Sequence, residues 1–360
     1  MDFSFWQIII AAVTAIILFI ALNVIKRTVK LYGYMKKAQM SMMQGIPEKA
    51  LEYLNRIIEI DPGFAEAHSN RSGALIDLQR YEEALISADK AIELKPGLAD
   101  AYSNRAAAMI GMKRYKDALE TSDTALKLNS KYAMAYNNRA VALFGLSRYD
   151  EAIQSSDKAI GIDPDLGISY INKAAALINL KRFEESLIST EKALSINPHL
   201  PQVHINMGTA LCNLKKPEEA IKACDKALEL NPFSPDAHCT RAAALINLNR
   251  HEEAIDDCND ALGINPDYQT AYFNKGLALM KISRFEESLE SIKKALEINP
   301  GYDSAAYNIA CCYGLMNKPI EAAEYLQKAI VMNSIWKEKA DVDADFDQVR
   351  NDDGFKKVLT

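Results

Sequence analysis

The chain repeats one 34-residue pattern, which is clearest in two adjoining copies. Residues 99–132 read ADAYSNRAAAMIGMKRYKDALETSDTALKLNSKY, and residues 133–166 read AMAYNNRAVALFGLSRYDEAIQSSDKAIGIDPDL. Outward from these copies, prolines recur at the same period, with Ser130 and Ser334 at the missing steps: Pro62, Pro96, Pro164, Pro198, Pro232, Pro266 and Pro300. Nine consecutive units then occupy residues 31–336. Such repetition predicts a chain of stacked units without one central core.

Three positions of each unit carry a small residue in units two to nine. The eighth and twentieth positions hold only Ala, Gly or Ser, and the twenty-seventh is Ala in all eight units, from Ala91 to Ala329. Apolar residues recur between them at helical spacing, so each unit is predicted to be a hairpin of two closely packed helices. An aromatic residue at the seventeenth position is predicted to pack beneath the turn, and the proline ends the second helix.

The combination of length, small positions, aromatic residue and proline resembles the tetratricopeptide repeat. The resemblance implies an all-α, right-handed superhelical solenoid of about nine helical hairpins, with a groove lined by the first helix of each unit. The first unit departs most, with Ile57 in place of Ala and Pro47 at the aromatic position. Residues 337–360 are acidic and resemble the closing segment of such arrays. They are therefore predicted to cap the final unit.

An apolar segment precedes the repeats. From Ile8 to Ile25 only Thr14 and Asn23 are polar, and eighteen helical residues extend roughly 27 Å, enough to cross the hydrocarbon core of a bilayer. Residues 1–30 are predicted to form a transmembrane anchor, spanning at 6–25, with a basic flank. That flank places the repeats on the cytoplasmic side. A cleaved signal peptide is the alternative, which the absence of basic residues before Lys26 disfavours.

Composition narrows the function further. The net charge is −6, and residues 1–30 carry +2, so the remainder carries −8, which disfavours nucleic acid as a partner. The six cysteines are never spaced as Cys-x-x-Cys, and the five histidines are dispersed, so we expect no zinc site, disulfide framework or cofactor. The sequence contains no phosphate loop or nucleophile elbow, and the repeats leave no room for a catalytic domain. The protein is predicted not to be an enzyme.

Asparagine recurs where packing gives no reason for it. The sixth position of units two to nine is Asn in seven of eight cases: Asn70, Asn104, Asn138, Asn172, Asn206, Asn274 and Asn308. A second, shorter row stands at the thirteenth position: Asn179, Asn213 and Asn247. Asn is a mediocre helix former, and a carboxamide matches the donor and acceptor of a peptide group. In the family the sixth position faces the groove, so the rows resemble a ladder that holds an extended polypeptide. Alternatively, the amides bond between neighbouring helices.

Charges on the units favour a structural interpretation. The family's clamp for acidic chaperone tails resembles a site with a basic residue at the second position, and this chain has none there, so chaperone C-terminal tails are disfavoured as partners. Basic residues at position seven, such as Arg105, and acids at position twenty-five, such as Asp123, are predicted to pair within a unit.

These observations predict a non-catalytic, membrane-anchored scaffold that binds an extended segment of a partner protein in its groove. The alternative is a structural assembly factor of a membrane or envelope complex that acts through convex or end surfaces. The fold serves many processes, so the sequence names no partner.

Overall fold

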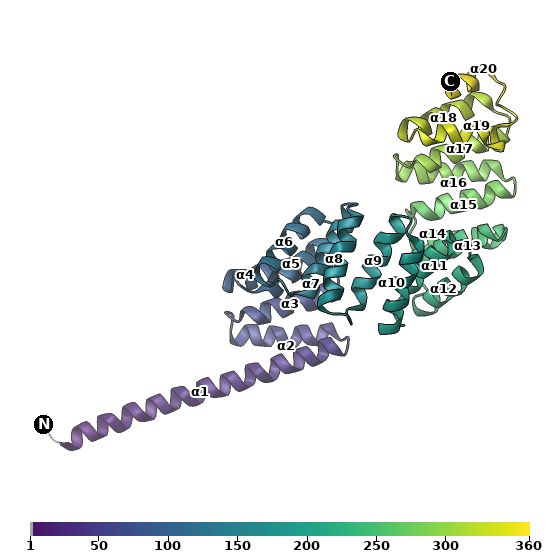
Figure 1. The fold of residues 1–360 in the computed structure, drawn as a ribbon. Helices are drawn as coiled ribbons and strands as arrows, with labels where there is room; N and C mark the ends of the chain where they lie inside the picture. The colour runs from purple at the N-terminus through teal and green to yellow at the C-terminus, as the bar shows by residue number, and fades with distance from the viewer. Residues whose placement is uncertain (1–2) are drawn as a thin grey trace. The chain divides into compact units, whose positions relative to one another are not determined.

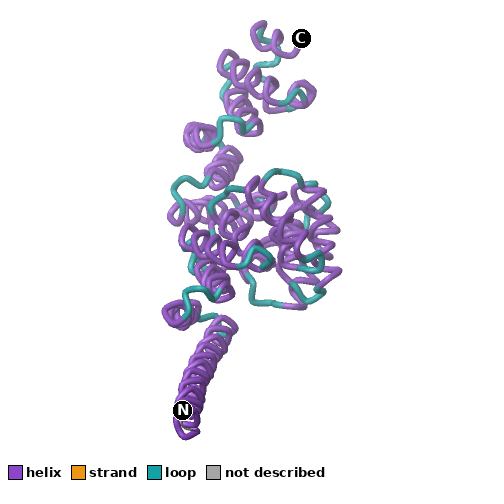
Figure 2. Tube along the Cα trace, turned by 90° about the vertical axis from the view of Figure 1, so that its left-hand side faces the viewer, coloured by secondary structure: helices purple, strands orange, loops and turns teal. Residues whose placement is uncertain are grey.

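The structure is a computed structural model that describes residues 3–360. Within that range the regular elements are all helices, joined by short loops, as Figure 2 shows. The predicted all-α array of consecutive hairpins is therefore confirmed. The chain divides into two compact halves, one ending at Ala176 and the other beginning at Leu177.

Successive helices pair as antiparallel hairpins within each unit (Figure 1). The first half contains α1 (Phe3–Met43), α2 (Pro47–Ile60), α3 (Ala65–Asp77), α4 (Tyr81–Leu94), α5 (Ala99–Gly111), α6 (Tyr115–Leu128), α7 (Ala133–Gly145) and α8 (Tyr149–Ile162). The division lies within α9 (Gly167–Asn179). The second half continues with α10 (Phe183–Ile196), α11 (Pro201–Asn213), α12 (Pro217–Leu230), α13 (Pro235–Asn247), α14 (His251–Ile264), α15 (Gln269–Lys281), α16 (Phe285–Ile298), α17 (Asp303–Leu315), α18 (Pro319–Met332), α19 (Ile335–Val342), η1 (Ala344–Phe346) and α20 (Asp353–Leu359).

Helix α1 joins the apolar segment to the first hairpin without a break. It has 41 residues, so it is roughly 60 Å long, and every residue from Ile10 to Lys30 is exposed. Its last third packs on α2, where Ala38, Leu54 and Ile57 are buried together. Helix α1 is long and apolar enough to span a membrane. The predicted boundary at residue 30 falls inside α1 and the one at 336 inside α19.

The turn inside each unit has the same backbone conformation. Position fifteen is Gly45 in the first unit, with a φ of 68°, and it adopts a positive φ of 55° to 61° in the next eight units although none of these residues is Gly: Gln79, Lys113, Ser147, Lys181, Lys215, Asn249, Ser283 and Asn317. In one example, Lys113 N donates to Ile110 O at 2.9 Å and Arg114 N to Met109 O at 2.8 Å, the two bonds of a Schellman motif. The left-handed residue ends the first helix and reverses the chain.

The aromatic residue of position seventeen packs on the next unit. A Cβ placed on Gly111 of α5 would lie 2.3 Å from the ring of Tyr81 in α4, and one on Gly145 would lie 2.5 Å from Tyr115. Glycine at the end of the first helix therefore makes room for the preceding unit's tyrosine, and the ring joins two hairpins.

The predicted ion pairs within units are wrong, because the basic side chain points to the preceding unit instead. Its partner is the position-twenty-five acid sixteen residues earlier, in Arg105–Asp89 at 2.7 Å, Arg139–Asp123 at 2.8 Å and Lys173–Asp157 at 2.7 Å. The first helix of a unit lies against the second helix of its predecessor, as α5 does against α4 and α7 against α6, which brings these positions together. These three ion pairs therefore join neighbouring hairpins rather than the two helices of one hairpin.

The segment after α18 folds back over α17 and α18. Trp336 stacks on Tyr307 with ring centroids 4.3 Å apart, and the Tyr307 hydroxyl donates to Asp343 Oδ2 at 2.6 Å. Phe346 and Phe355 are fully buried beside them. A Cβ on Gly314 of α17 would lie 2.5 Å from the carbonyl oxygen of Asp345, so η1 lies directly on that helix. These contacts cover the apolar face that a further unit would cover.

We predict that Gly111→Ala destabilises α5, because the added methyl group displaces the Tyr81 ring. Overpacking of this kind costs about 1–3 kcal/mol. Native-state amide hydrogen exchange of α5 would show it as a smaller local opening free energy. Gly161→Ala is the matched control, since it also replaces a helical glycine by alanine but places the new Cβ where no atom lies within 4 Å. Equal exchange in both variants would contradict the packing of Tyr81 on Gly111.

Candidate functional site

A hollow in the first half of the chain is lined by several of the residues that the sequence singled out. Its volume is about 520 Å³, and residues of α1, α2, α3, α5 and the turn before α7 line it. We call it the α1–α7 hollow. Its lining is mixed apolar and polar: Ala38, Gln39, Met42, Met43, Leu54, Asn70, Gly73, Asp100, Asn104 and Tyr132. A smaller hollow of about 320 Å³ adjoins it through Gln39, Asn70 and Asp100.

Asn70 and Asn104 differ from each other in what their amide groups already bind. Asn104 Nδ2 donates to the backbone carbonyl of Ser69 at 2.9 Å, whereas Asn70 Nδ2 meets only the Met35 sulfur at 3.2 Å, a weak acceptor. Neither side-chain oxygen accepts a hydrogen bond from another residue of the described range, 3–360. Both residues line the hollow and keep unused hydrogen-bonding capacity, of which Asn70 keeps the larger share.

The other members of the sixth-position row are hydrogen-bonded within the chain, most of them through the side-chain nitrogen. Asn138 donates to the Ser103 carbonyl at 2.9 Å, Asn172 to Asn137 Oδ1 at 2.8 Å and Asn274 to the Cys239 carbonyl at 3.0 Å, each on the preceding unit. Asn308 bonds the Ser304 carbonyl of its own helix at 2.8 Å, and Asn206 accepts from Gln202 at 3.2 Å. The row thus joins neighbouring first helices, which is the structural alternative that the sequence left open. A role in peptide binding stays a prediction.

The thirteenth-position asparagines are exposed at the ends of their helices. Asn213 donates to the Thr209 carbonyl at 2.8 Å, and Asn247 to Cys212 Sγ at 3.3 Å. Asn179 is exposed at the end of α9. None of the three lines the α1–α7 hollow.

The charge of the α1–α7 hollow is negative. Asp100 makes no ion pair with any residue of the described chain, while Glu66 in the adjoining hollow binds Lys95 at 2.7 Å, which lowers the pKa of Glu66. Burial, followed by the nearby Asp100 carboxylate, raises the pKa of Tyr132 to about 12, so this phenol stays neutral. The residues that line both hollows include no Lys, Arg or His among those described.

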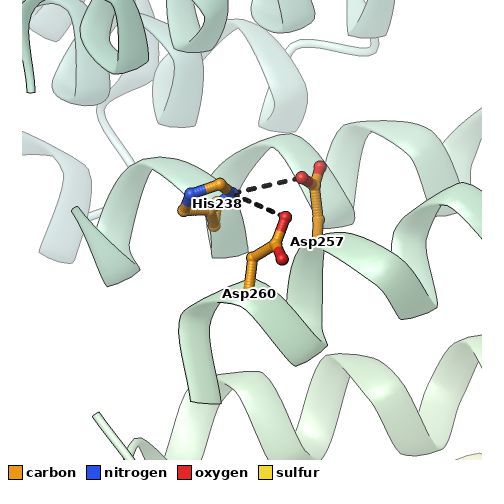
Figure 3. Close-up of side chains that lie close together, drawn as sticks. All are labelled: His238, Asp257 and Asp260. Atoms are coloured by element: carbon orange, nitrogen blue, oxygen red, sulfur yellow. Dashed lines mark hydrogen bonds and ion pairs between the residues drawn. The ribbon is translucent and has the colours of Figure 1, made fainter. Parts of the chain in front are cut away.

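A second polar cluster lies between α13 and α14, as Figure 3 shows. His238 Nδ1 is 3.2 Å from Asp257 Oδ1 and 4.0 Å from Asp260 Oδ2, and its Nε2 is 3.3 Å from the Pro232 carbonyl. The hydrogen bond to Asp257 raises the pKa of His238. Burial acts to raise the pKa of Asp257, but its bonds to Arg241 and His238 lower it overall.

These residues have the composition of a metal site but not its electrostatics. Both oxygens of Asp257 accept hydrogen bonds from Arg241, at 2.8 and 2.6 Å, and Arg241 also bonds Asp225 of α12 at 2.6 Å. A cation bound to His238 and Asp257 would face that guanidinium. The cluster is instead an ion-pair network that holds α12, α13 and α14 together. The contact given for His204 lies elsewhere, between its Nε2 and the Pro198 carbonyl at 3.0 Å.

A third group, Cys311 with Asp343 and Asp345, lies under the C-terminal segment. The Tyr307 hydroxyl donates a hydrogen bond to the Asp343 carboxylate, and burial strongly raises the pKa of the Cys311 thiol. A protonated thiol is a poor ligand and a poor nucleophile. This group is part of the packing of the cap.

Comparison with known families agrees with the repeat geometry. Models described as tetratricopeptide repeat match residues 42–99, 110–166, 168–200, 201–234, 235–268, 270–302 and 303–334. The chain belongs to the tetratricopeptide repeat family. The tetratricopeptide repeats support a general function as a protein–protein interaction scaffold.

The similar proteins resemble this tetratricopeptide array only in part. The uncharacterized protein MJ0572 of Methanocaldococcus jannaschii is 47% identical over 51 residues, which are 14% of this chain and 59% of that protein. The crystal structure of the APC/C hetero-tetramer Cut9–Hcn1 has a TM-score of 0.65 at 16% identity, covering 87% of this chain and 59% of that chain. The thermophilic protein TTC0263 of Thermus thermophilus has a TM-score of 0.46 at 19% identity, covering 50% and 98%. The chain thus spans about 59% of the length of the first two, and the likeness to Cut9–Hcn1 at 16% identity shows the fold alone.

We predict that the stability of the α13–α14 hairpin depends on pH through His238. Its pKa is raised in the folded state, so its contribution is complete below the unfolded value near 6.5 and is lost as pH rises through the folded pKa. Hydrogen exchange of α13 at several pH values should show this loss in the unmodified chain. His238→Gln, which keeps a polar side chain, should flatten the profile. Superimposable pH profiles for the two proteins would exclude a charged His238.

Proposed function

We propose that this protein is a non-catalytic, membrane-anchored scaffold whose α1–α7 hollow binds an extended segment of a partner protein. The observation that carries the proposal is the pair of incompletely bonded amides, Asn70 and Asn104, in one hollow. In this proposal the other asparagines of the row hold neighbouring hairpins together and do not contact the partner, since most of their nitrogens are used within the array.

The hollow suits a peptide rather than a small polar molecule. Met42, Met43 and Leu54 form an apolar wall against which a side chain of the partner can pack. The amides of Asn70 and Asn104 line the same hollow and can hydrogen-bond main-chain groups of the partner. Gly73 of α3 also lines the hollow, where a Cβ would lie 3.8 Å from Asn104 Nδ2, and its absence leaves the backbone accessible to a chain passing over the helix. Recognition of main-chain groups requires an extended segment, because a helical partner has already bonded those groups internally.

A scaffold role needs no reacting group, and the thiols support that interpretation. Cys224 and Cys239 are buried, which raises the pKa of each to about 12, so neither forms a thiolate near neutral pH.

The membrane anchor is proposed on the exposure of α1. An apolar helical surface that no described residue covers is unfavourable in water, and a bilayer covers it. The basic flank favours an array on the cytoplasmic side.

We expect the full-length chain to stay with membranes after alkaline carbonate extraction, with its N-terminal residues still present by mass spectrometry. A chain lacking residues 1–25 should appear in the soluble fraction. A mature protein that begins beyond residue 25 would show that the segment is a cleaved signal peptide.

We predict that Asn70→Ala together with Asn104→Ala weakens partner binding by roughly 30-fold, as expected from the loss of two hydrogen bonds of about 1 kcal/mol each. Partners photocrosslinked in solubilised membranes would be compared between this variant and the unmodified chain. Asn138→Ala is the matched control, because Asn138 makes the same bond to the preceding carbonyl and does not line the hollow. An identical set of partners in all three proteins would move the function to a convex or end surface.

A further inference from the structure

We propose that the α1–α7 hollow receives the basic juxtamembrane segment of a second membrane protein, with a Lys or Arg at Asp100 and a bulky aliphatic side chain against Met42, Met43 and Leu54. The inference rests on the proposed function and names the class of partner for the same hollow. It follows from the charge of the hollow, its apolar wall and its distance from the apolar segment.

Charge selects a cationic segment. Asp100 is exposed and has no ion-pair partner in the described chain, and the lining contributes no positive charge. Glu66, the other acid nearby, is already neutralised by Lys95 at 2.7 Å. An incoming cation therefore gains one carboxylate without displacing an existing ion pair, whereas an acidic segment meets only repulsion.

The apolar wall selects the neighbouring residue. Met43 is 87% exposed at the end of α1, Met42 is half-buried, and Leu54 forms a fully buried floor. Methionine side chains are flexible and polarisable, so they adapt to aliphatic groups of different shape. Covering Met43 removes apolar surface from water, which favours binding without specifying one residue.

Distance selects a segment close to a membrane. Helix α1 is continuous, so Gln39 and Met43 lie 14 and 18 residues beyond Ile25, about 21 to 27 Å along the axis. An extended chain rises about 3.3 Å per residue, so a partner leaving the bilayer reaches the hollow after roughly six to eight residues. That stretch is where membrane proteins concentrate Lys and Arg on the cytoplasmic side.

The basic flank of a second copy does not fit this description. Its residues 26–37 lie within helix α1, and Arg27 bonds the Ile60 carbonyl at 3.0 Å and Asp61 at 3.3 Å. Those residues are helical and partly bonded, whereas the hollow calls for an extended segment.

The test uses the full-length chain in lipid nanodiscs with a synthetic probe. The probe is a membrane helix of twenty leucines followed by a Gly-Ser spacer of two, seven or fourteen residues and the sequence photo-leucine-Lys-Lys. Irradiation followed by mass spectrometry measures the yield of crosslinks to residues 38–54. We expect the highest yield with the seven-residue spacer and at least a fivefold loss when both lysines are replaced by glutamine.

Asp100→Asn should cause the same loss with the lysine probe. Asp236→Asn is the matched control, because Asp236 also lies beside a tyrosine hydroxyl, that of Tyr268, and lies far from the hollow in sequence. Equal losses in Asp100→Asn and Asp236→Asn would overturn the assignment of Asp100.

Other outcomes separate this inference from the proposed function. Equal crosslinking of lysine and glutamine probes, abolished by Asn70→Ala with Asn104→Ala, would overturn the inference and leave the hollow a peptide site. Equal yields at all spacer lengths, or from a soluble peptide without the leucine helix, would overturn the membrane origin of the segment. Absence of crosslinks from every probe, together with partner sets unchanged in the asparagine variants, would overturn both.

Discussion

Packing of each hairpin against its predecessor is the constraint on which the rest of this structure depends. A pair of short helices cannot bury its own apolar faces, so the neighbouring hairpin must cover them. The three recurring side-chain contacts all serve this purpose: tyrosine on glycine, basic residue with acid, and asparagine with the preceding carbonyl. Because each contact joins adjacent units, the array extends without a common core.

Such an array must treat its two ends differently from its middle. At the C-terminal end, Trp336, Phe346 and Phe355 cover the last hairpin with aromatic surface. At the N-terminal end, helix α1 is itself the first helix of the first hairpin and continues as the apolar segment. At this end Met35 offers Asn70 only a sulfur, whereas Asn104 and Asn138 each donate to a backbone carbonyl of the preceding unit. An incomplete contact at the start of the array thus leaves hydrogen-bonding capacity for a partner.

The sequence predicted much of the local structure and less of the site. Helix boundaries follow from prolines, small residues and spacing, all of which act within one unit. The asparagine row was visible too, but its members look alike in sequence and differ in their bonds. Only the neighbouring residue in space, Met35 for Asn70 and Ser69 for Asn104, separates them. The left-handed turn at residues such as Lys113 gave no signal either, since no glycine stands there.

By itself, the sequence determined the repeat, its helices and the apolar N-terminal segment, because these depend on interactions between residues near one another in the chain. Tertiary structure decided which unit each charge pairs with, which amides keep free capacity and where the α1–α7 hollow forms. Those properties depend on side chains about 16 or 35 residues apart, which the stacking of hairpins brings into contact. A repeating pattern fixes what lies at each position, while the direction in which each helix faces its neighbour fixes what that position touches.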